Sequence, residues 1–186
     1  MYHIANDKRA LRSAKYIYEG LEKCLNKKSF DKITISDIHE ESYVSRATFY
    51  RLFDNLRDVL VYRCDLIFDE IIEALWKLNE VTAKNIFIKY VELWMEYSDF
   101  LEKLINNGFI NIIYEAHVKR MDIIKELLLP DIGINNSEKD YLLSILSGLM
   151  ASSFRVWCQH ERKESPQQLH KQIELCVDIL NKMICS

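Results

Sequence analysis

The sequence is poor in the residues that make turns. It has four glycines and two prolines in 186 residues, and 49% of its residues are hydrophobic. An all-β fold needs frequent turns between short strands, so this composition argues against one. Long stretches with apolar residues three and four positions apart are typical of amphipathic helices instead. The sequence therefore predicts an all-α protein.

The sequence also lacks the signatures of a disulfide framework, a metal site and a membrane span. Its cysteines are odd in number and include no Cys-x-x-Cys pair: Cys24, Cys64, Cys158, Cys176 and Cys185. This pattern favours a reducing compartment, so we expect a cytoplasmic protein with no bound metal. No apolar run approaches about 18 residues, and charges interrupt the N-terminus, so we expect neither a membrane span nor a signal peptide.

Catalytic motifs are missing as well. His39-Glu40-Glu41 lacks the second histidine that a helical zinc-protease motif needs, and no glycine-rich phosphate loop is present. Cys158 and His160 are close in sequence, but near a predicted helix end chance proximity explains the pair. The sequence therefore predicts neither an enzyme nor a cofactor.

Charge is distributed unevenly along the chain. The formal net charge is −3, yet residues 1–63 contain 12 lysines and arginines against 9 aspartates and glutamates. The remaining residues contain 13 basic and 19 acidic side chains. A basic N-terminal part followed by an acidic remainder is compatible with nucleic-acid binding, although the excess is modest.

The segment TISDIHEESYVSRATFYRLF, residues 34–53, predicts two short helices joined by a tight turn. Thr34 can cap the first helix, with Asp37 as the reciprocal partner of a capping box. Residues 41–44 would form the turn, and Ser45 can cap the second helix. This arrangement is a helix-turn-helix.

The second of these helices has two chemically different faces. Phe49, Leu52 and Phe53 have the spacing of a stripe that faces a core. The opposite face would carry Arg46, Ala47, Tyr50 and Arg51. Two arginines, a tyrosine hydroxyl and a small residue suit insertion into a major groove and contact with phosphates. An exposed polar face without a DNA partner is the alternative, and the capped helix-turn-helix around it favours DNA.

Periodicity and cap signals predict about nine helices. The first helix spans about residues 7–26, and a long helix capped by Asp54 or Asn55 reaches about residue 78. Later helices are expected from about Thr82, from Ser98 to Asn107-Gly108, over 109–128 before Pro130, from Ser137 to about His160, and from Pro166 after a Ser165 cap.

Several motifs in the chain occur together in one known family. Residues 30–60 contain an aromatic, then Thr-Ile-x-Asp-Ile, Val-Ser-x-x-Thr-Phe-Tyr-x-x-Phe and Leu-x-x-Val-Leu, and Gly148, Trp157 and Ser165-Pro166 follow later. This pattern resembles the TetR family of bacterial one-component transcriptional regulators. The resemblance implies a helix-turn-helix DNA-binding domain over residues 1–55 and a helical effector-binding and dimerisation domain over residues 56–186.

The family reads duplex DNA through its third helix. The resemblance therefore implies DNA contacts from Thr34, Ser45, Arg46, Ala47, Thr48, Tyr50 and Arg51. Thr34 would hold a backbone phosphate, although its role as an N-cap is an equal explanation. Two positions depart from the family. Ser42-Tyr43 replaces a small residue and glycine, so Tyr43 must adopt a left-handed conformation or the turn must differ, and Leu56 replaces a phosphate-binding lysine.

The resemblance also implies a pocket for a small-molecule effector between the central helices. The aromatic side chains and the histidine that suit such a pocket are Trp76, Tyr90, Trp94, Tyr97, Phe100, Tyr114 and His117. For any one of them, an ordinary core position is the simpler interpretation. As a group, they suit an apolar or aromatic ligand, because rings bury a large area and some keep a polar group.

Two apolar stripes on the last two helices predict a homodimer. Their residues are Leu142, Ile145, Leu149, Val156, Ile173 and Leu180. Gly148 begins a flank of small residues, which close helix packing explains either within one protomer or across a dimer. Two copies would pack as a four-helix bundle, and a two-fold protein matches a palindromic operator.

The sequence thus predicts a homodimeric transcriptional regulator that binds a palindromic operator and is controlled by a small molecule. A repressor is the simplest form, although the same fold can activate. The alternative is a helical protein-interaction module or co-regulator of the same fold. In that case the departures at Tyr43 and Leu56 would have weakened DNA binding.

Overall fold

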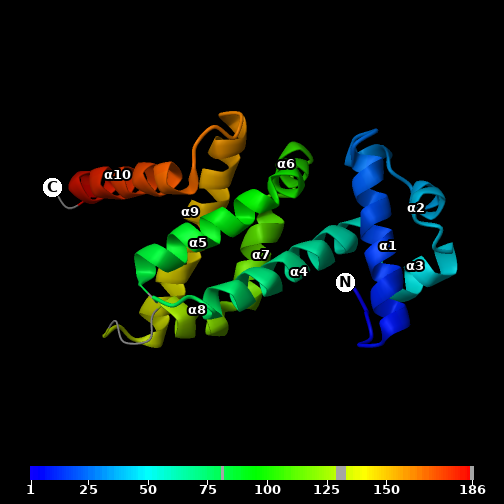
Figure 1. Ribbon diagram of the computed structural model, residues 1–186, viewed down its shortest axis with the longest axis horizontal. Coiled ribbons are helices and arrows are strands. Elements are labelled where there is room, and N and C mark those ends of the chain that lie inside the picture. The colour runs from blue at the N-terminus through cyan, green and yellow to red at the C-terminus, as the bar shows by residue number, and fades with distance from the viewer. Residues whose placement is uncertain (81, 129–132, 185–186) are drawn as a thin grey trace. The chain divides into compact units, whose positions relative to one another are not determined.

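The computed structural model describes residues 1–80, 82–128 and 133–184 (Figure 1). These residues form ten α-helices and one short 3-10 helix. Their only β-type pairing is an isolated bridge between Tyr2 and Phe53. The predicted all-α class is confirmed, with one helix more than the nine expected.

The chain divides into two compact units, Met1–Ile67 and Phe68–Ser186, here called the head and the body. The division falls inside α4 (Leu56–Trp76), a single helix of 21 residues that belongs to both units. The domain boundary expected after residue 55 coincides with the start of α4, and it stays a prediction.

The head is a small helical core. It contains α1 (Lys8–Leu25), a 3-10 helix (Phe30–Lys32), α2 (Ile35–Ser42), α3 (Arg46–Leu52) and the first part of α4. The Asp7 carboxylate caps α1 by accepting hydrogen bonds from the Arg9 and Ala10 N–H groups at 3.0 and 2.9 Å. The buried face of α1 packs against α2 and α3, so the helix-turn-helix rests on α1.

α1 and α2 approach each other closely at Gly20. A Cβ atom at this position would lie 3.0 Å from Cβ of Ser42. The Ser42 hydroxyl is buried and donates a hydrogen bond to the Ile38 carbonyl at 2.6 Å. Small residues at both positions therefore set the distance between the two helices.

The body contains the rest of α4 and six further helices. These are α5 (Ala83–Glu96), α6 (Ser98–Asn106), α7 (Asn111–Lys119), α8 (Met121–Leu128), α9 (Asn136–Gln159) and α10 (Pro166–Ile184). Its core holds the fully buried rings of Phe68, Trp94 and Phe154. The ring centroids of Phe68 and Trp94 lie 5.7 Å apart, and those of Trp94 and Phe154 lie 6.0 Å apart.

Two predicted helix starts in the body are confirmed. Thr82 caps α5 by accepting a hydrogen bond from the Asn85 N–H at 3.2 Å. Ser165 and Gln168 make reciprocal side-chain to backbone hydrogen bonds at 2.8 and 3.3 Å, with Pro166 in the first helical position.

The structure also identifies the residues that cap α4 and α9. Asn55, rather than Asp54, caps α4, because its side-chain oxygen accepts a hydrogen bond from the Asp58 N–H at 3.0 Å. The expected cap at Ser137 is wrong. Asn135 forms a capping box with Glu138, so α9 begins before Ser137.

The single helix expected over residues 109–128 is also wrong, because α7 and α8 are separate helices. The break falls at Arg120, whose guanidinium is buried. Its Nε and Nη2 lie 2.8 and 2.7 Å from one Asp69 oxygen on α4. The helix is interrupted where this side chain turns inward, and no glycine or proline marks the position. The expected stop at Pro130 lies outside the described residues.

α9 is the one helix of the described residues that is long and apolar enough to cross a membrane by length and composition alone. A core helix of a soluble protein passes the same test, so the indication is weak. Leu143, Met150, Phe154 and Trp157 bury one face of α9, and the helix packs against α6, α7 and α8. The four described cysteines form no disulfide, and Cys185 lies outside the described residues.

Candidate functional site

The predicted capping box at the start of α2 is present. The Asp37 carboxylate accepts a hydrogen bond from the Thr34 N–H at 2.7 Å, and the Thr34 hydroxyl oxygen accepts one from the Asp37 N–H at 3.3 Å. Lys28 lies 2.7 Å from the same carboxylate. The Lys28 ammonium and then the Thr34 donors lower the pKa of Asp37 to about 2. The cap is therefore fully charged at neutral pH, with Thr34 exposed beside it.

The turn between α2 and α3 adopts a left-handed conformation at Tyr43, with φ 58° and ψ 16°. This settles the alternative that the sequence left open. The Tyr43 N–H donates to the His39 carbonyl at 2.9 Å, and the Val44 N–H donates to the Ser42 hydroxyl at 3.1 Å. The Tyr43 side chain is 89% exposed, so backbone and neighbouring hydrogen bonds hold the turn rather than its ring.

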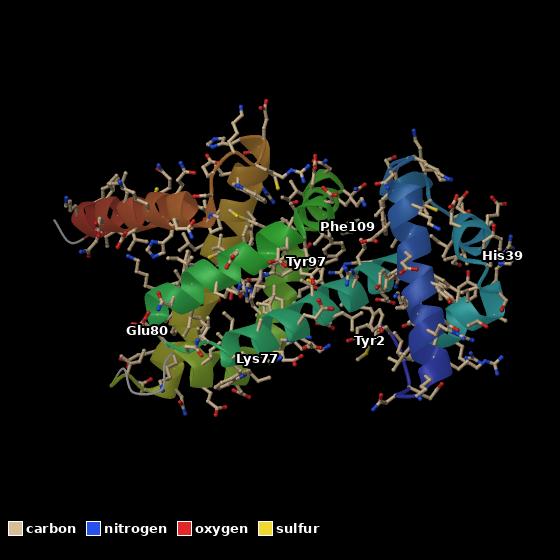
Figure 2. The ribbon with its side chains drawn as sticks, viewed as in Figure 1. Tyr2, His39, Lys77, Glu80, Tyr97 and Phe109 are labelled. Carbon is tan, nitrogen blue, oxygen red and sulfur yellow. The ribbon has the colours of Figure 1, made fainter. Side chains whose placement is uncertain are left out.

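His39 supports the same turn from α2. Its Nδ1 donates a hydrogen bond to the Val44 carbonyl at 2.9 Å. Figure 2 labels His39 at α2 in the head. The contact joins the last turn of α2 to the residue before the Ser45 cap, so it helps to set the angle at which α3 begins.

α3 has the two faces that the sequence predicts. Ser45 caps it by accepting a hydrogen bond from the Thr48 N–H at 3.2 Å. Phe49, Leu52 and Phe53 are buried, whereas Arg46, Ala47, Tyr50 and Arg51 are exposed. The Arg46 guanidinium donates to the Ser36 hydroxyl at 2.6 Å, which ties the exposed face of α3 to α2. The helix-turn-helix thus presents two arginines and a tyrosine on a rigid support.

The N-terminal segment supports the end of α3, which sequence reasoning missed. The Tyr2 hydroxyl donates to the Asp65 carboxylate on α4 at 2.6 Å, and the His3 N–H donates to the Leu52 carbonyl at 2.8 Å. Figure 2 shows the Tyr2 side chain in the head beside α4. An extended segment of three residues has no periodicity, so only the apolar and aromatic character of Tyr2 pointed to packing.

The body contains a cavity of about 240 Å³. Its walls come from α4, α5, α7, α8 and α9, and they are mainly aliphatic and aromatic. The polar side chains on the walls are Tyr90, His117 and Ser147. This composition, apolar with a few polar groups, is typical of sites for small organic molecules.

A hydrogen-bonded pair lies on the cavity wall. Tyr90 Oη and His117 Nε2 are 2.6 Å apart. Burial and the positive charge of Arg120 lower the pKa of His117 to about 3, although the Ile113 carbonyl opposes this shift. His117 is therefore neutral at physiological pH and serves as a hydrogen-bonding group rather than a cation.

The structure places two of the predicted effector residues, Tyr90 and His117, on the cavity wall. The others lie elsewhere: Trp94 and Phe100 are in the core, Trp76 is half exposed, the Tyr97 hydroxyl donates to Glu70, and the Tyr114 hydroxyl is 2.9 Å from Ser144 Oγ. Tyr97, labelled in Figure 2, lies between α5 and α6, as the C-cap of one helix and the N-cap of the other. The aliphatic walls were missed, because in sequence they are indistinguishable from ordinary core residues.

The predicted dimer residues differ in exposure. Ile145, Val156 and Leu180 are exposed, Leu142 and Leu149 are half-buried, and Ile173 is buried within the body. The end of α10 exposes a longer set than the sequence indicated: Leu175, Val177, Ile179, Leu180, Met183 and Ile184. Figure 1 shows this end projecting beyond the other helices of the body.

The surroundings of Gly148 test one explanation for the small-residue flank, namely close helix packing within one protomer. A Cβ atom at Gly148 would have no neighbour within 4 Å in the described part of the chain. Close packing within the protomer therefore does not require a glycine at this position, and a contact between two copies stays a prediction.

Comparison with known proteins identifies the fold. No protein-family profile matches the chain, and no curated protein matches it in sequence. Among solved structures, Lin0861 from Listeria innocua aligns over 96% of each chain with 18% identity and a TM-score of 0.76. A TetR transcriptional regulator from Streptococcus agalactiae aligns over 92% of this chain and 96% of its own, with 18% identity and a TM-score of 0.59.

A third structure, the dihydroxyacetone kinase operon activator DhaS, covers 92% of this chain and 97% of its own length, with 19% identity and a TM-score of 0.57. At these identities the likeness concerns the fold. Because each alignment covers at least 92% of this chain, the likeness includes both the head and the body. The chain has the TetR-like all-α fold.

Proposed function

We propose that this protein is a TetR-type transcriptional regulator that binds a palindromic operator as a homodimer and responds to a small molecule held in the body cavity. The observation that carries the proposal is the capped α2-turn-α3 unit. Its buried face is fixed on the head, and its exposed face presents Arg46, Tyr50 and Arg51. This chemistry suits both base edges and phosphates.

The residues proposed to contact DNA are Thr34, Ser45, Arg46, Ala47, Thr48, Tyr50 and Arg51. Arginine can bind guanine edges or phosphates through two N–H groups, and the tyrosine hydroxyl suits a phosphate oxygen. Ala47 is small, so it allows the helix to approach the bases. The Arg46 contact with Ser36 holds that guanidinium beside α2 and would have to rearrange or be shared on binding.

The dimer is proposed to form through α9 and α10. The apolar side chains that are exposed there include Ile145, Val156 and Leu180. Contiguous exposed apolar surface favours association, and a pair of helices from each of two copies makes a four-helix bundle. A two-fold dimer would present two α3 helices to half-sites about one DNA turn apart, or a multiple of this distance.

α4 is the proposed link between ligand and DNA. Phe68, Ile71 and Leu75 place one side of α4 on the cavity wall, and the same helix begins in the head at Leu56. A ligand that favours one position of α4 would shift the population of DNA-binding dimers. A preference of about 100-fold for one state corresponds to roughly 2.7 kcal/mol of coupling. Repression released by the ligand is the simplest form.

Selection of bound fragments from a random duplex library tests the proposal. Purified protein at near-physiological salt should recover a palindrome whose half-site spacing fits a two-fold dimer. The selection is repeated with a metabolite pool, because an activator can need its ligand to bind. Recovery of no preferred sequence under either condition, from an intact dimer, would contradict DNA-binding regulation.

The second candidate function is a protein-interaction module of the same fold. One observation favours it: Tyr43 projects fully exposed from the turn beside α3, where the family usually has glycine. Salt dependence separates the two functions. The affinity of a DNA reader falls steeply as salt rises, because binding releases counterions from phosphates. An interaction module would show no saturable DNA binding at any salt concentration.

A further inference from the structure

The wall of the body cavity carries no charged side chain among the residues that the structure describes. Twelve apolar aliphatic or aromatic side chains line the wall, and a charged group placed among them would lose hydration without gaining a counter-ion. Taking an unpaired ion into such a site is strongly unfavourable. The wall therefore selects against carboxylates, phosphates and amines.

The positive charge of Arg120, three residues after the wall residue His117, is already paired with a carboxylate. Its guanidinium is bound to Asp69. His117 itself is neutral, because burial and Arg120 keep its pKa low. Neither residue offers a positive charge to an anionic ligand.

Two polar features of the wall can recognise an uncharged group. Ser147 is buried, and its hydroxyl donates a hydrogen bond to the Leu143 carbonyl at 2.7 Å. A hydroxyl has one donor and two acceptor lone pairs, so the Ser147 oxygen can still accept a hydrogen bond. The Tyr90 and His117 pair lies on the same wall. A ligand hydroxyl would match the acceptor that Ser147 presents.

The volume restricts the size of the ligand. An engineered cavity of about 150 Å³ holds benzene, and sites for drug-sized ligands usually enclose about 300 to 1,000 Å³. The cavity of about 240 Å³ lies between these limits. It suits a substituted single ring or a medium-length alkyl chain.

We propose that the cavity binds a small, uncharged, largely apolar molecule with one hydroxyl group, which donates a hydrogen bond to Ser147. This inference deepens the proposed function, on which it rests for the role of the cavity as an effector site. The hydroxyl supplies orientation, and burial of the apolar part supplies most of the affinity.

A shape-matched ligand series tests the class directly. 4-Isopropylphenol, 4-isopropylbenzoate and 4-isopropylbenzylammonium differ mainly in the charge of one substituent, and 1-octanol with octanoate gives the same comparison for a chain. Calorimetry without DNA should show at least one neutral alcohol or phenol binding about 100-fold or more tighter than its charged analogues. Equal or tighter binding of a charged analogue would overturn the proposal, and so would failure of both neutral hydroxyl compounds to bind.

Variants of α9 test the role of Ser147. Ser147→Ala should weaken binding of the preferred hydroxyl compound about tenfold, in line with one lost hydrogen bond. It should leave the affinity for p-cymene, which has a methyl group instead, nearly unchanged. Ser144→Ala is the matched control, because Ser144 is on the same helix and contacts Tyr114 rather than the cavity. If Ser147→Ala changes the affinity for both ligands equally, or changes neither, Ser147 does not bind the ligand hydroxyl.

Operator binding separates failure of this inference from failure of the proposed function. If a neutral hydroxyl compound binds but leaves operator affinity unchanged, the ligand class stands and the effector role of the cavity fails. If operator affinity instead responds only to a charged compound, regulation by a ligand stands and the inferred ligand class is wrong.

Discussion

The head and the body are both helical, but different kinds of information position their functional parts. In the head, Thr34 pairs with Asp37 and Ser45 with Thr48, each three residues along the chain. In the body, the Tyr90 and His117 pair joins residues 27 positions apart. Local pairs follow from sequence order, whereas distant pairs depend on how helices pack. The residues of a site built on a short motif can therefore be predicted from the sequence, whereas the residues that line a cavity cannot.

The largest effect is expected in the core of the head. Phe49→Ala removes a ring that is 1% exposed, and should lower the free energy of unfolding by about 3–5 kcal/mol. Tyr50→Ala, on the next position of α3, removes a ring that is 59% exposed and should change stability by no more than about 0.5 kcal/mol. Urea denaturation followed by circular dichroism measures both. Similar losses for the two variants would mean that α3 is oriented differently.

The next effect concerns the exposed apolar end of the body. Leu180→Glu places a charge in the proposed dimer surface, and should convert the dimer to a folded monomer with operator affinity reduced by roughly 100-fold. Gln172→Glu adds the same charge to an exposed position of the same helix and is the control. Sedimentation equilibrium gives the oligomeric state. A Leu180→Glu protein that remains dimeric would exclude this part of α10 from the interface.

Two glycines give opposite expectations in the two units. Gly20→Ala should destabilise the head by about 1–3 kcal/mol, because the new Cβ would lie 3.0 Å from Cβ of Ser42. Gly148→Ala should stabilise the body by roughly 0.5–1 kcal/mol, because a helical glycine is replaced where nothing lies within 4 Å. Thermal unfolding measures both effects. Both variants are made in the Leu180→Glu background, so that contacts with a second copy do not contribute to the measured stability. The same sign in both variants would contradict the packing described.

The smallest effect is expected at the turn. Tyr43 has φ 58°, and a left-handed conformation costs a residue with a side chain roughly 1–2 kcal/mol. Tyr43→Gly should therefore stabilise the head by about 1 kcal/mol, after allowance for the greater entropy of unfolded glycine. Tyr16→Gly, in the exposed face of α1, should destabilise it by a similar amount. If Tyr43→Gly does not stabilise the head, the backbone of the turn differs from the left-handed conformation described at Tyr43.

The sequence predicted most of the head because its signals are local. The caps at Thr34 and Ser45 and the buried stripe of α3 follow from spacing alone. The segment around Tyr2 was not predicted, because it packs on residues far along the chain; the Tyr2 hydroxyl donates to Asp65, 63 positions away.

The body was predicted less completely for physical reasons. The break at Arg120 depends on an ion pair with Asp69, 51 positions away, and has no local signal. Ser137 is as good a capping residue as Asn135, so composition alone does not place the start of α9. Trp94 and Tyr90 are alike in sequence, but only Tyr90 lies on the cavity wall. Which aromatic faces a cavity is decided by the packing of several helices.

The central proposal is that the exposed face of α3 reads DNA, and affinity for the selected duplex tests it most directly. Binding is measured for the parent protein, Arg46→Ala, Tyr50→Ala and the control Tyr16→Ala, at two salt concentrations. We expect both α3 variants to lose at least about tenfold in affinity with unchanged thermal stability, consistent with roughly 1–3 kcal/mol for each contact. Tyr16→Ala should bind as the parent does. If both α3 variants bind the duplex as tightly as the parent, α3 is not the element that reads DNA.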